Sequence, residues 1–230
     1  MNINGYIDST NLSKVATSED IMKLCEDACK YHFATVCVPP YYVKACKEYL
    51  KKSTIEVCSV IGFPNGYSTS EVKQYEAIDA IHSGADEIDM MININALKNK
   101  DYEYIKNEIE MIRDSIDGKV LKVIIETCLL TDDEIIKMTE ICNDTFVNFI
   151  KTSTGFDKNG ADIKQVKLIN QHKSDVLEIK ASGGITSLDD ILSFIDEGVT
   201  RIGTSHAVDI INGVDIKKDT CHCKCHKEEK

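Results

Sequence analysis

The sequence predicts a (β/α)8 barrel, a closed ring of eight parallel strands that alternate with helices. Short apolar runs rich in β-branched residues recur along the chain and are separated by stretches with helical spacing. Strands alternating with helices indicate a parallel sheet, and eight such units are the number that closes a barrel. The eight runs span residues 3–9, 33–38, 55–63, 86–93, 120–127, 146–153, 176–183 and 200–205.

The stretches between these runs have the periodicity and start signals of helices. Apolar side chains fall on one face in two of them: Ile105, Ile109 and Ile112 in the first, and Leu188, Ile191, Leu192 and Ile195 in the second. A hydroxyl followed three residues later by a carboxylate can satisfy the free N–H groups of a first helical turn. This pattern predicts helix starts at Ser68 with Glu71, Thr131 with Glu134, and Ser187 with Asp190.

The main alternative architecture is an open, doubly wound sheet. Against it, no G-x-G-x-x-G follows the first strand, and G-x-x-x-x-G-K-[ST] occurs nowhere in the 230 residues. A hydrophobic content of 43% in a chain of this length is ample for one large core. We therefore expect one barrel domain over 1–213 and a short, disordered Cys/His-rich tail over 214–230.

The charge balance excludes several classes of partner. Acidic residues outnumber basic ones by 38 to 27, a net charge of −11, which disfavours nucleic acid and anionic membranes. No apolar run approaches the roughly 18 residues of a membrane span, and MNINGYIDST lacks the features of a signal peptide. The sequence thus predicts a cytoplasmic protein. Its barrel cysteines are expected to be reduced thiols: Cys25, Cys29, Cys37, Cys46, Cys58, Cys128 and Cys142.

Ionisable residues interrupt the apolar runs, where strands covered by helices should be apolar throughout. They are Asp8, Asp89, Lys122, Lys151 and Lys180, and most lie near the predicted carboxyl ends of their strands. That end of a barrel holds the active site, with catalytic residues drawn from several strands. The alternative is a structural network of ion pairs filling the barrel mouth. Five positions converging on one end favour an active site.

Two of these lysines, Lys151 and Lys180, come from consecutive strands and so from neighbours in a barrel. Ammonium groups about 5 Å apart at an effective dielectric near 20 repel by about 3 kcal/mol, roughly two pKa units. One lysine of the pair should then supply the neutral amine that attacks a carbonyl to form a Schiff base. Lys122 could add to the same field, and spacing does not say which lysine is the nucleophile.

Glycine-rich turns follow the late strands, at Gly155, Gly183, Gly184 and Gly203. Small residues let backbone N–H groups approach an anion, and barrels often bind phosphate in the loops after strands seven and eight. Ordinary turns that need glycine for their geometry are the alternative. Beside the lysines, the set favours a phosphorylated substrate.

At these positions the sequence resembles the deoxyribose-phosphate aldolase family, over roughly residues 5–213. The matching segments are VCSVIGFPNG (57–66), GADEIDMMINI (84–94), KVIIETCLLT (122–131), FIKTSTGF (149–156), KASGGI (180–185) and RIGTS (201–205). The resemblance implies a (β/α)8 barrel and a class I aldol reaction through a lysine Schiff base, with no cofactor and no metal in the active site. It also implies reversible cleavage of 2-deoxy-D-ribose 5-phosphate to acetaldehyde and D-glyceraldehyde 3-phosphate, in deoxyribonucleotide catabolism.

The resemblance also assigns roles. Lys151 in FIKTSTG matches the Schiff-base lysine, and Lys180 in KASGG matches the second lysine that tunes the first and moves protons. Asp89 in EIDM matches a carboxylate that relays protons through water, and Asp8 in YIDST matches an acidic partner of the second lysine. Lys122 supports the cluster. The expected substrate-binding residues are Cys37, Thr152, Gly155, Gly183, Gly184, Gly203 and Ser205.

The chain departs from the family pattern near the expected phosphate site. Thr186 stands where the family pattern GGIR has arginine, and Ser205-His206 replaces a serine pair. Asp8 is followed by Ser9-Thr10 where many members have His-Thr. The changes at Thr186 and at Ser205-His206 remove a charge and a hydroxyl from the expected phosphate site. They bear on the affinity for phosphate and not on the aldol chemistry. His206 could itself meet the phosphate, or it could face solvent at a helix start.

The tail KKDTCHCKCHKEEK (217–230) gathers Cys and His, the usual ligands of zinc and soft metals. Its candidate ligands are Cys221, His222, Cys223, Cys225 and His226. The spacing is not C-x2-C and suits a loose, exposed chelate, so metal binding, redox cross-linking and the absence of any role all remain open. The tail is no evidence for a metal-dependent aldolase.

Two other functions compete with a Schiff-base lyase. The chain could be another phosphosugar barrel, such as an isomerase, an epimerase or a different lysine aldolase. The paired KTSTG and KASGG segments disfavour this, since they supply the two lysines together. A degenerate barrel whose tail senses metal or redox state is disfavoured because the five ionisable positions are intact. We further expect a homodimer or a higher homo-oligomer acting on a small phosphosugar.

Overall fold

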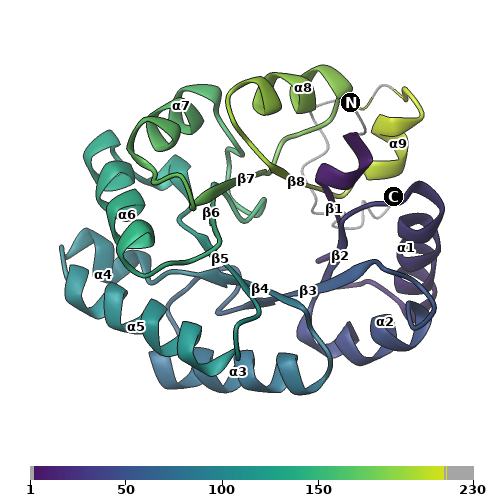
Figure 1. Ribbon diagram of the computed structural model, residues 1–230, viewed down its shortest axis with the longest axis horizontal. Coiled ribbons are helices and arrows are strands. Elements are labelled where there is room, and N and C mark those ends of the chain that lie inside the picture. The colour runs from purple at the N-terminus through teal and green to yellow at the C-terminus, as the bar shows by residue number, and fades with distance from the viewer. Residues whose placement is uncertain (1–2, 215, 217–230) are drawn as a thin grey trace, which may run out of the picture.

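Eight parallel strands form a closed barrel in chain order, and β8 pairs back onto β1 (Figure 1). The computed structural model describes residues 3–214 and 216. The strands are β1 (Ile7–Thr10), β2 (Thr35–Val38), β3 (Glu56–Ile61), β4 (Glu87–Met91), β5 (Val120–Ile124), β6 (Phe149–Lys151), β7 (Glu178–Ser182) and β8 (Arg201–Thr204). The predicted (β/α)8 fold class is confirmed.

Helices form a ring outside the strands (Figure 1). They are α1 (Ser18–Tyr31), α2 (Val43–Tyr49), α3 (Ser70–His82), α4 (Ile94–Lys98), α5 (Tyr102–Ser115), α6 (Asp132–Asp144), α7 (Ile163–His172), α8 (Leu188–Asp196) and α9 (Ala207–Ile211). Three 3-10 turns accompany them: η1 (Ile3–Tyr6), η2 (Pro40–Tyr42) and η3 (Thr127–Leu129). Because η1 occupies the first half of the run 3–9, the first strand is shorter than predicted.

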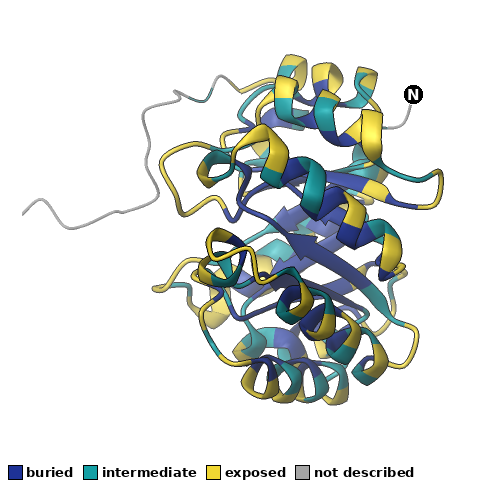
Figure 2. Ribbon diagram, turned by 90° about the vertical axis from the view of Figure 1, so that its left-hand side faces the viewer, coloured by how far each residue is buried: buried dark blue, intermediate teal, exposed yellow. Residues whose placement is uncertain are grey.

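The main apolar core lies between the helix ring and the strands, and Cys37, Cys58 and Val60 form a second, small apolar cluster. Figure 2 shows the strands buried and the outer helix faces exposed. On α5 the predicted apolar face is confirmed, with Ile105, Ile109 and Ile112 fully buried. On α8 it is wrong in part, because the helix packs through Ile191 and Phe194 and leaves Leu188 and Leu192 exposed.

Side-chain caps fix where several helices begin. The capping boxes predicted at Thr131 and Ser187 are confirmed. The one predicted at Ser68 is wrong: α3 begins at Ser70 after Thr69, which makes no side-chain cap. Ser70 is buried and donates to Glu108 of α5 at 3.3 Å, so packing against α5 accompanies the later start. The capping box of Thr17 and Asp20 at α1 was missed.

The predictions for the tail concern residues that the structure does not describe, and Cys221, His222, Cys223, Cys225 and His226 lie among them. The boundary at 213/214 stays a prediction; it falls just after α9. Among the described residues, none of the helices is long and apolar enough to cross a membrane.

Replacing Thr131 with alanine should lower the free energy of unfolding by about 1 kcal/mol, because the Glu134 N–H in the first turn of α6 loses the Thr131 hydroxyl that accepts it. Urea denaturation measures this change. Ser68→Ala is the matched control and should change it by less than about 0.5 kcal/mol. Equal losses in the two variants would contradict the assignment of the caps.

Candidate active site

Asp89, in the middle of β4, is the centre of a buried cluster inside the barrel. Its Oδ2 atom lies 2.7 Å from Lys151 Nζ and 2.7 Å from Lys180 Nζ. Its Oδ1 atom lies 2.8 Å from Lys122 Nζ. Asp89, Lys122 and Lys180 have no exposed surface, and Lys151 is 3% exposed. One carboxylate thus contacts three lysine amino groups from three further strands.

A second tier of ion pairs supports this centre. Asp8 Oδ2 lies 2.6 Å from Lys180 Nζ, and Asp8 Oδ1 lies 2.8 Å from a guanidinium nitrogen of Arg201. The same nitrogen is 3.2 Å from both carboxylate oxygens of Glu87, which also pairs with Lys122. Opposite charges therefore alternate through the barrel interior, as burial of several charges requires.

Strand register explains why these side chains meet. Asp89 is level with Lys122 on β5, Lys151 with Lys180 on β7, and Lys180 with Arg201 on β8. The predicted neighbourhood of Lys151 and Lys180 is confirmed. Lys151 ends its strand. Asp8, Asp89, Lys122 and Lys180 each stand two residues before the last residue of their strands, near the carboxyl ends as predicted.

Glu87 and Arg201 were missed by the sequence analysis. Glu87 stands two residues before Asp89 on β4, so period-two alternation turns it to the same face of the strand. Arg201 opens β8 within RIGTS. Both are ionisable residues next to apolar runs, the same kind of pattern that identified the five predicted residues. However, each stands at the start of its run, where a charged residue is typical of the protein surface.

The electrostatics differ from the lysine–lysine repulsion expected from sequence. Burial alone would lower the pKa of Lys180, but the carboxylates of Asp8 and Asp89 outweigh it and raise the pKa above its usual value. The pKa of Lys122 is likewise raised against its burial, by Asp89 first. Because Asp89 lies between the lysines, attraction replaces bare repulsion there, and Lys180 is a fixed cation.

The carboxylates respond in the opposite direction. Burial would raise the pKa of Asp89, but Lys122, Lys151 and Lys180 hold it well below the ordinary aspartate value. The pKa of Asp8 is also lowered, since Lys180 and Arg201 oppose its burial. Both groups are therefore anions near neutral pH.

The glycine turns predicted to bind phosphate form close backbone contacts at the same end of the barrel. Gly183 has a φ of +83°, and a Cβ there would lie 2.9 Å from Gly160 Cα and 3.4 Å from Gly155 Cα. The turns after β6 and β7 therefore pack backbone to backbone. Gly184 follows Gly183 in the same turn with a φ of +70°. The turn predicted at Gly203 is wrong, because Gly203 lies inside β8, where a Cβ would lie 3.2 Å from Lys180 Cε.

Thr152 and Glu126 hold these turns in place. The Thr152 hydroxyl is 3.1 Å from the Ser182 N–H and 3.3 Å from the Ser182 carbonyl oxygen, which ties β6 to β7. Glu126 is buried in the left-handed region at φ 51°, and its carboxylate accepts the Thr154 N–H at 3.1 Å and the Thr154 hydroxyl. The sequence analysis missed Glu126, although it directly follows an apolar run in IIET.

The predicted site residue Cys37 lies fully buried on β2, level with Cys58 on β3. Cys58 Sγ is 3.1 Å from Asp89 Oδ1 and 3.3 Å from Lys122 Nζ. The two thiols therefore border the lysine–carboxylate cluster. All seven described cysteines are free, as expected for reduced thiols.

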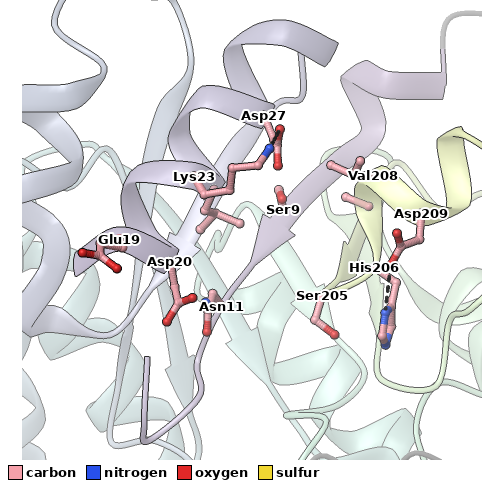
Figure 3. Close-up of a pocket in the computed structure, with 12 residues that line it drawn as sticks. Ser9, Asn11, Glu19, Asp20, Lys23, Asp27, Ser205, His206, Val208 and Asp209 are labelled. Carbon is pink, nitrogen blue, oxygen red and sulfur yellow. Dashed lines mark hydrogen bonds and ion pairs between the residues drawn. The ribbon is translucent and has the colours of Figure 1, made fainter. Parts of the chain in front are cut away.

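A pocket of about 330 Å³ lies between β1, α1 and the β8–α9 turn (Figure 3). It includes Ser205 and His206 but none of the three cluster lysines. His206 precedes α9 and pairs with Asp209 at 3.7 Å, with 22% of its side chain exposed. The pocket is lined by four acidic residues, Glu19, Asp20, Asp27 and Asp209, and by two basic residues, Lys23 and His206.

Fold and site together define a parallel barrel enzyme with a buried lysine–carboxylate centre. Residues 4–222 match the DeoC/LacD family aldolases. The deoxyribose-phosphate aldolase of Finegoldia magna is 49% identical over 213 residues, which cover 93% of this chain and 100% of that one. That of Thermococcus kodakarensis is 49% identical over 212 residues, covering 90% and 95%.

A solved structure agrees with these sequence relatives. The tetrameric deoxyribose phosphate aldolase of Aeropyrum pernix matches with a TM-score of 0.86 and 32% identity, over 91% of this chain and 89% of that one. The chain belongs to the DeoC/LacD family of aldolases, and it is therefore a lyase.

Acid should destabilise the protein through its buried aspartates. A lowered folded-state pKa contributes stability that is present above the unfolded value of about 3.9 and lost as the pH falls below it. The free energy of unfolding in urea should therefore fall between about pH 5 and about pH 2, and Asp8→Asn should flatten this dependence. Asp114→Asn, at an exposed position, is the control. An unchanged slope in Asp8→Asn would contradict the assignment.

Proposed function

We propose that this chain catalyses the reversible cleavage of 2-deoxy-D-ribose 5-phosphate to acetaldehyde and D-glyceraldehyde 3-phosphate through a Schiff base on Lys151. The observation that supports it most directly is the placement of Asp89 Oδ2 at 2.7 Å from both Lys151 Nζ and Lys180 Nζ. The names of the relatives at 49% identity support the choice of substrate.

Lys151 is the lysine of the three that is suited to attack a carbonyl. Lys180 is paired with Asp8 and Asp89, and Lys122 with Glu87 and Asp89, so each is held as a cation by two carboxylates at close range. Among the described ion pairs, Lys151 contacts Asp89 alone. It also ends its strand, at the mouth where a substrate enters.

The charge count of the cluster supports an uncharged Lys151. Four basic groups, Lys122, Lys151, Lys180 and Arg201, meet three acidic ones, Asp8, Glu87 and Asp89. A neutral amine at Lys151 leaves three cations against three anions. Buried charge is least costly when it is balanced, and Schiff-base formation needs the amine form.

The proton transfers follow from this arrangement. Lys151 attacks C1 of the open-chain sugar, and Asp89 with Lys180 assists loss of water to give the iminium ion. The iminium withdraws electrons, so the C2–C3 bond breaks as the C3 hydroxyl loses its proton, and glyceraldehyde 3-phosphate leaves. Protonation of the enamine at C2 and hydrolysis then release acetaldehyde. Proton transfer by positioned groups typically contributes 10²- to 10⁴-fold.

The phosphate end of the substrate is assigned to the turns around Gly155, Gly183, Gly184 and Ser205, together with Gly203 of β8. Their close backbone packing supports an anion site built from N–H groups. Thr186 and His206 replace the family's arginine and serine, and the adjoining pocket is acidic. Phosphate binding in this chain therefore depends on backbone donors more than on charge.

The other expectations are kept as part of the proposal. The chain acts in the cytoplasm without a cofactor or an active-site metal, and Cys37 contacts the substrate. It assembles as a homodimer or a higher homo-oligomer; the related Aeropyrum pernix enzyme is a tetramer.

Borohydride trapping tests the Schiff base. After incubation with acetaldehyde and reduction, intact mass and peptide mapping should find a single ethyl adduct, on Lys151. The adduct should vanish in Lys151→Ala and persist in Lys167→Ala, a surface control that pairs with Glu197. Scattered labelling of surface lysines, or no adduct, would refute the proposal.

Lys180→Gln should lower kcat by at least about 100-fold, because the cation that assists proton transfer is lost. KM should change much less, since Lys180 has no part in phosphate binding. Steady-state kinetics with deoxyribose 5-phosphate measure both values, and circular dichroism checks the fold. Lys164→Gln is the exposed control. A variant with a raised KM and an unchanged kcat would show that Lys180 has a binding role instead.

A further inference from the structure

Two cysteines on neighbouring strands adjoin the catalytic cluster. No bond-making or proton-transfer step of the proposed aldol cycle uses their thiols. Cys37 of β2 and Cys58 of β3 are register partners. Their sulfur atoms and a carboxylate oxygen of Asp89 all lie within 4.8 Å of one another. Paired strands place their Cα atoms about 4.8 Å apart, inside the range of about 4.4–6.8 Å that disulfides span. The strand spacing is therefore within the range that a disulfide bridges.

The surroundings of this pair favour redox chemistry over metal binding. Two thiols and a carboxylate are possible cation ligands. However, three lysine amino groups already contact Asp89, with Lys122 Nζ at 3.3 Å from Cys58 Sγ. A divalent cation would be repelled at this point, whereas a thiolate would be stabilised.

Cys37 has the electrostatic environment of a reactive thiol. Contact with the Cys58 thiol lowers its pKa, and Lys180 and Lys151 act in the same direction against burial and Asp89. Among the described cysteines the shifts at Cys25, Cys58, Cys128 and Cys142 are all upward. A lowered pKa marks the attacking thiol, because the thiolate is the nucleophile.

We propose that Cys37 and Cys58 form a reversible disulfide when the protein meets a hydroperoxide, and that this bond switches the enzyme off. The Cys37 sulfur attacks one peroxide oxygen, the O–O bond breaks, and the alcohol (or water) leaves with the thiol proton, so that Cys37 becomes a sulfenic acid. The Cys58 sulfur then attacks the Cys37 sulfur, and the S–O bond breaks. Hydroxide leaves and takes the Cys58 proton as water. Two thiols are oxidised and one peroxide is reduced.

Loss of activity follows from the position of Cys58. Its thiol donates to Asp89 Oδ1, the oxygen that also binds Lys122. The disulfide removes this donor and moves the sulfur toward Cys37, so the orientation of Asp89 loses one of its supports. Access rests on the proposed function: the site that admits an aldehyde to Lys151 also admits hydrogen peroxide, which is smaller.

A second cysteine pair provides an internal comparison. Cys25 of α1 and Cys46 of α2 are buried and hydrogen-bonded to each other, but this bond and burial raise the pKa of Cys25. No lysine or arginine contributes to that shift. The Cys25–Cys46 pair should therefore stay reduced under conditions that oxidise Cys37 and Cys58.

Peroxide titration of the full chain tests this inference. After hydrogen peroxide treatment and alkylation, peptide mapping should find a Cys37–Cys58 linked peptide lighter by two hydrogens than the thiol pair. Activity should fall at least about tenfold in step with it and return with dithiothreitol. Mapping does not depend on turnover, so it distinguishes failure of this switch from failure of the aldolase proposal.

Three variants sharpen the test. Cys58→Ser should stop the cross-link and leave a Cys37 sulfenic acid that dimedone traps, whereas Cys37→Ser should show neither product. Cys29→Ser, at a partly exposed cysteine of α1, should behave as wild type, with activity compared to each variant's own untreated sample. Oxidation of Cys29, Cys128 or Cys25–Cys46 with Cys37 and Cys58 left reduced would overturn the proposal. So would sulfinic acid on wild-type Cys37 without any link to Cys58.

Discussion

The sharing of one carboxylate by three lysines is the interaction on which the rest of the site depends. Asp89 is fully buried, and without it Lys122, Lys151 and Lys180 would face one another inside a closed barrel. Such an arrangement would be strongly repulsive at short range in a low-dielectric interior. The carboxylate holds the lysines at contact distance and leaves one of them, Lys151, with a single anionic partner. The same carboxylate therefore offsets the repulsion among the lysines and distinguishes Lys151 from the other two.

The outer tier makes that asymmetry stable. Asp8 and Glu87 bind Lys180, Lys122 and Arg201, so these cations are fixed by pairs of carboxylates. The barrel interior is thus a charge-balanced polar core within an apolar shell. Glu126 extends the same principle to the mouth, where a buried carboxylate holds the backbone of Thr154 close to Lys151. Rigid strands and tethered turns then present the reactive amine in a defined geometry.

The sequence anticipated the barrel and the inner cluster because both depend on local patterns. Apolar runs gave eight strands, and a charge inside such a run marked Asp8, Asp89, Lys122, Lys151 and Lys180. The same approach overlooked Glu87, Arg201 and Glu126, because a charge at the edge of a run looks like an ordinary surface residue. It misplaced the start of α3 for a similar reason: Ser70 is buried against Glu108 of α5, a contact between helices distant in sequence.

By itself, the sequence determined the fold class and the chemical types present inside it, since strand periodicity and buried ionisable residues are properties of short segments. Only the tertiary structure decided how the charges act on one another. Register set Lys151 level with Lys180 and Asp89 level with Lys122, and barrel closure turned all four inward. The expected repulsion between two lysines became attraction to a common carboxylate, because electrostatic effects depend on distances across the barrel that no linear spacing contains.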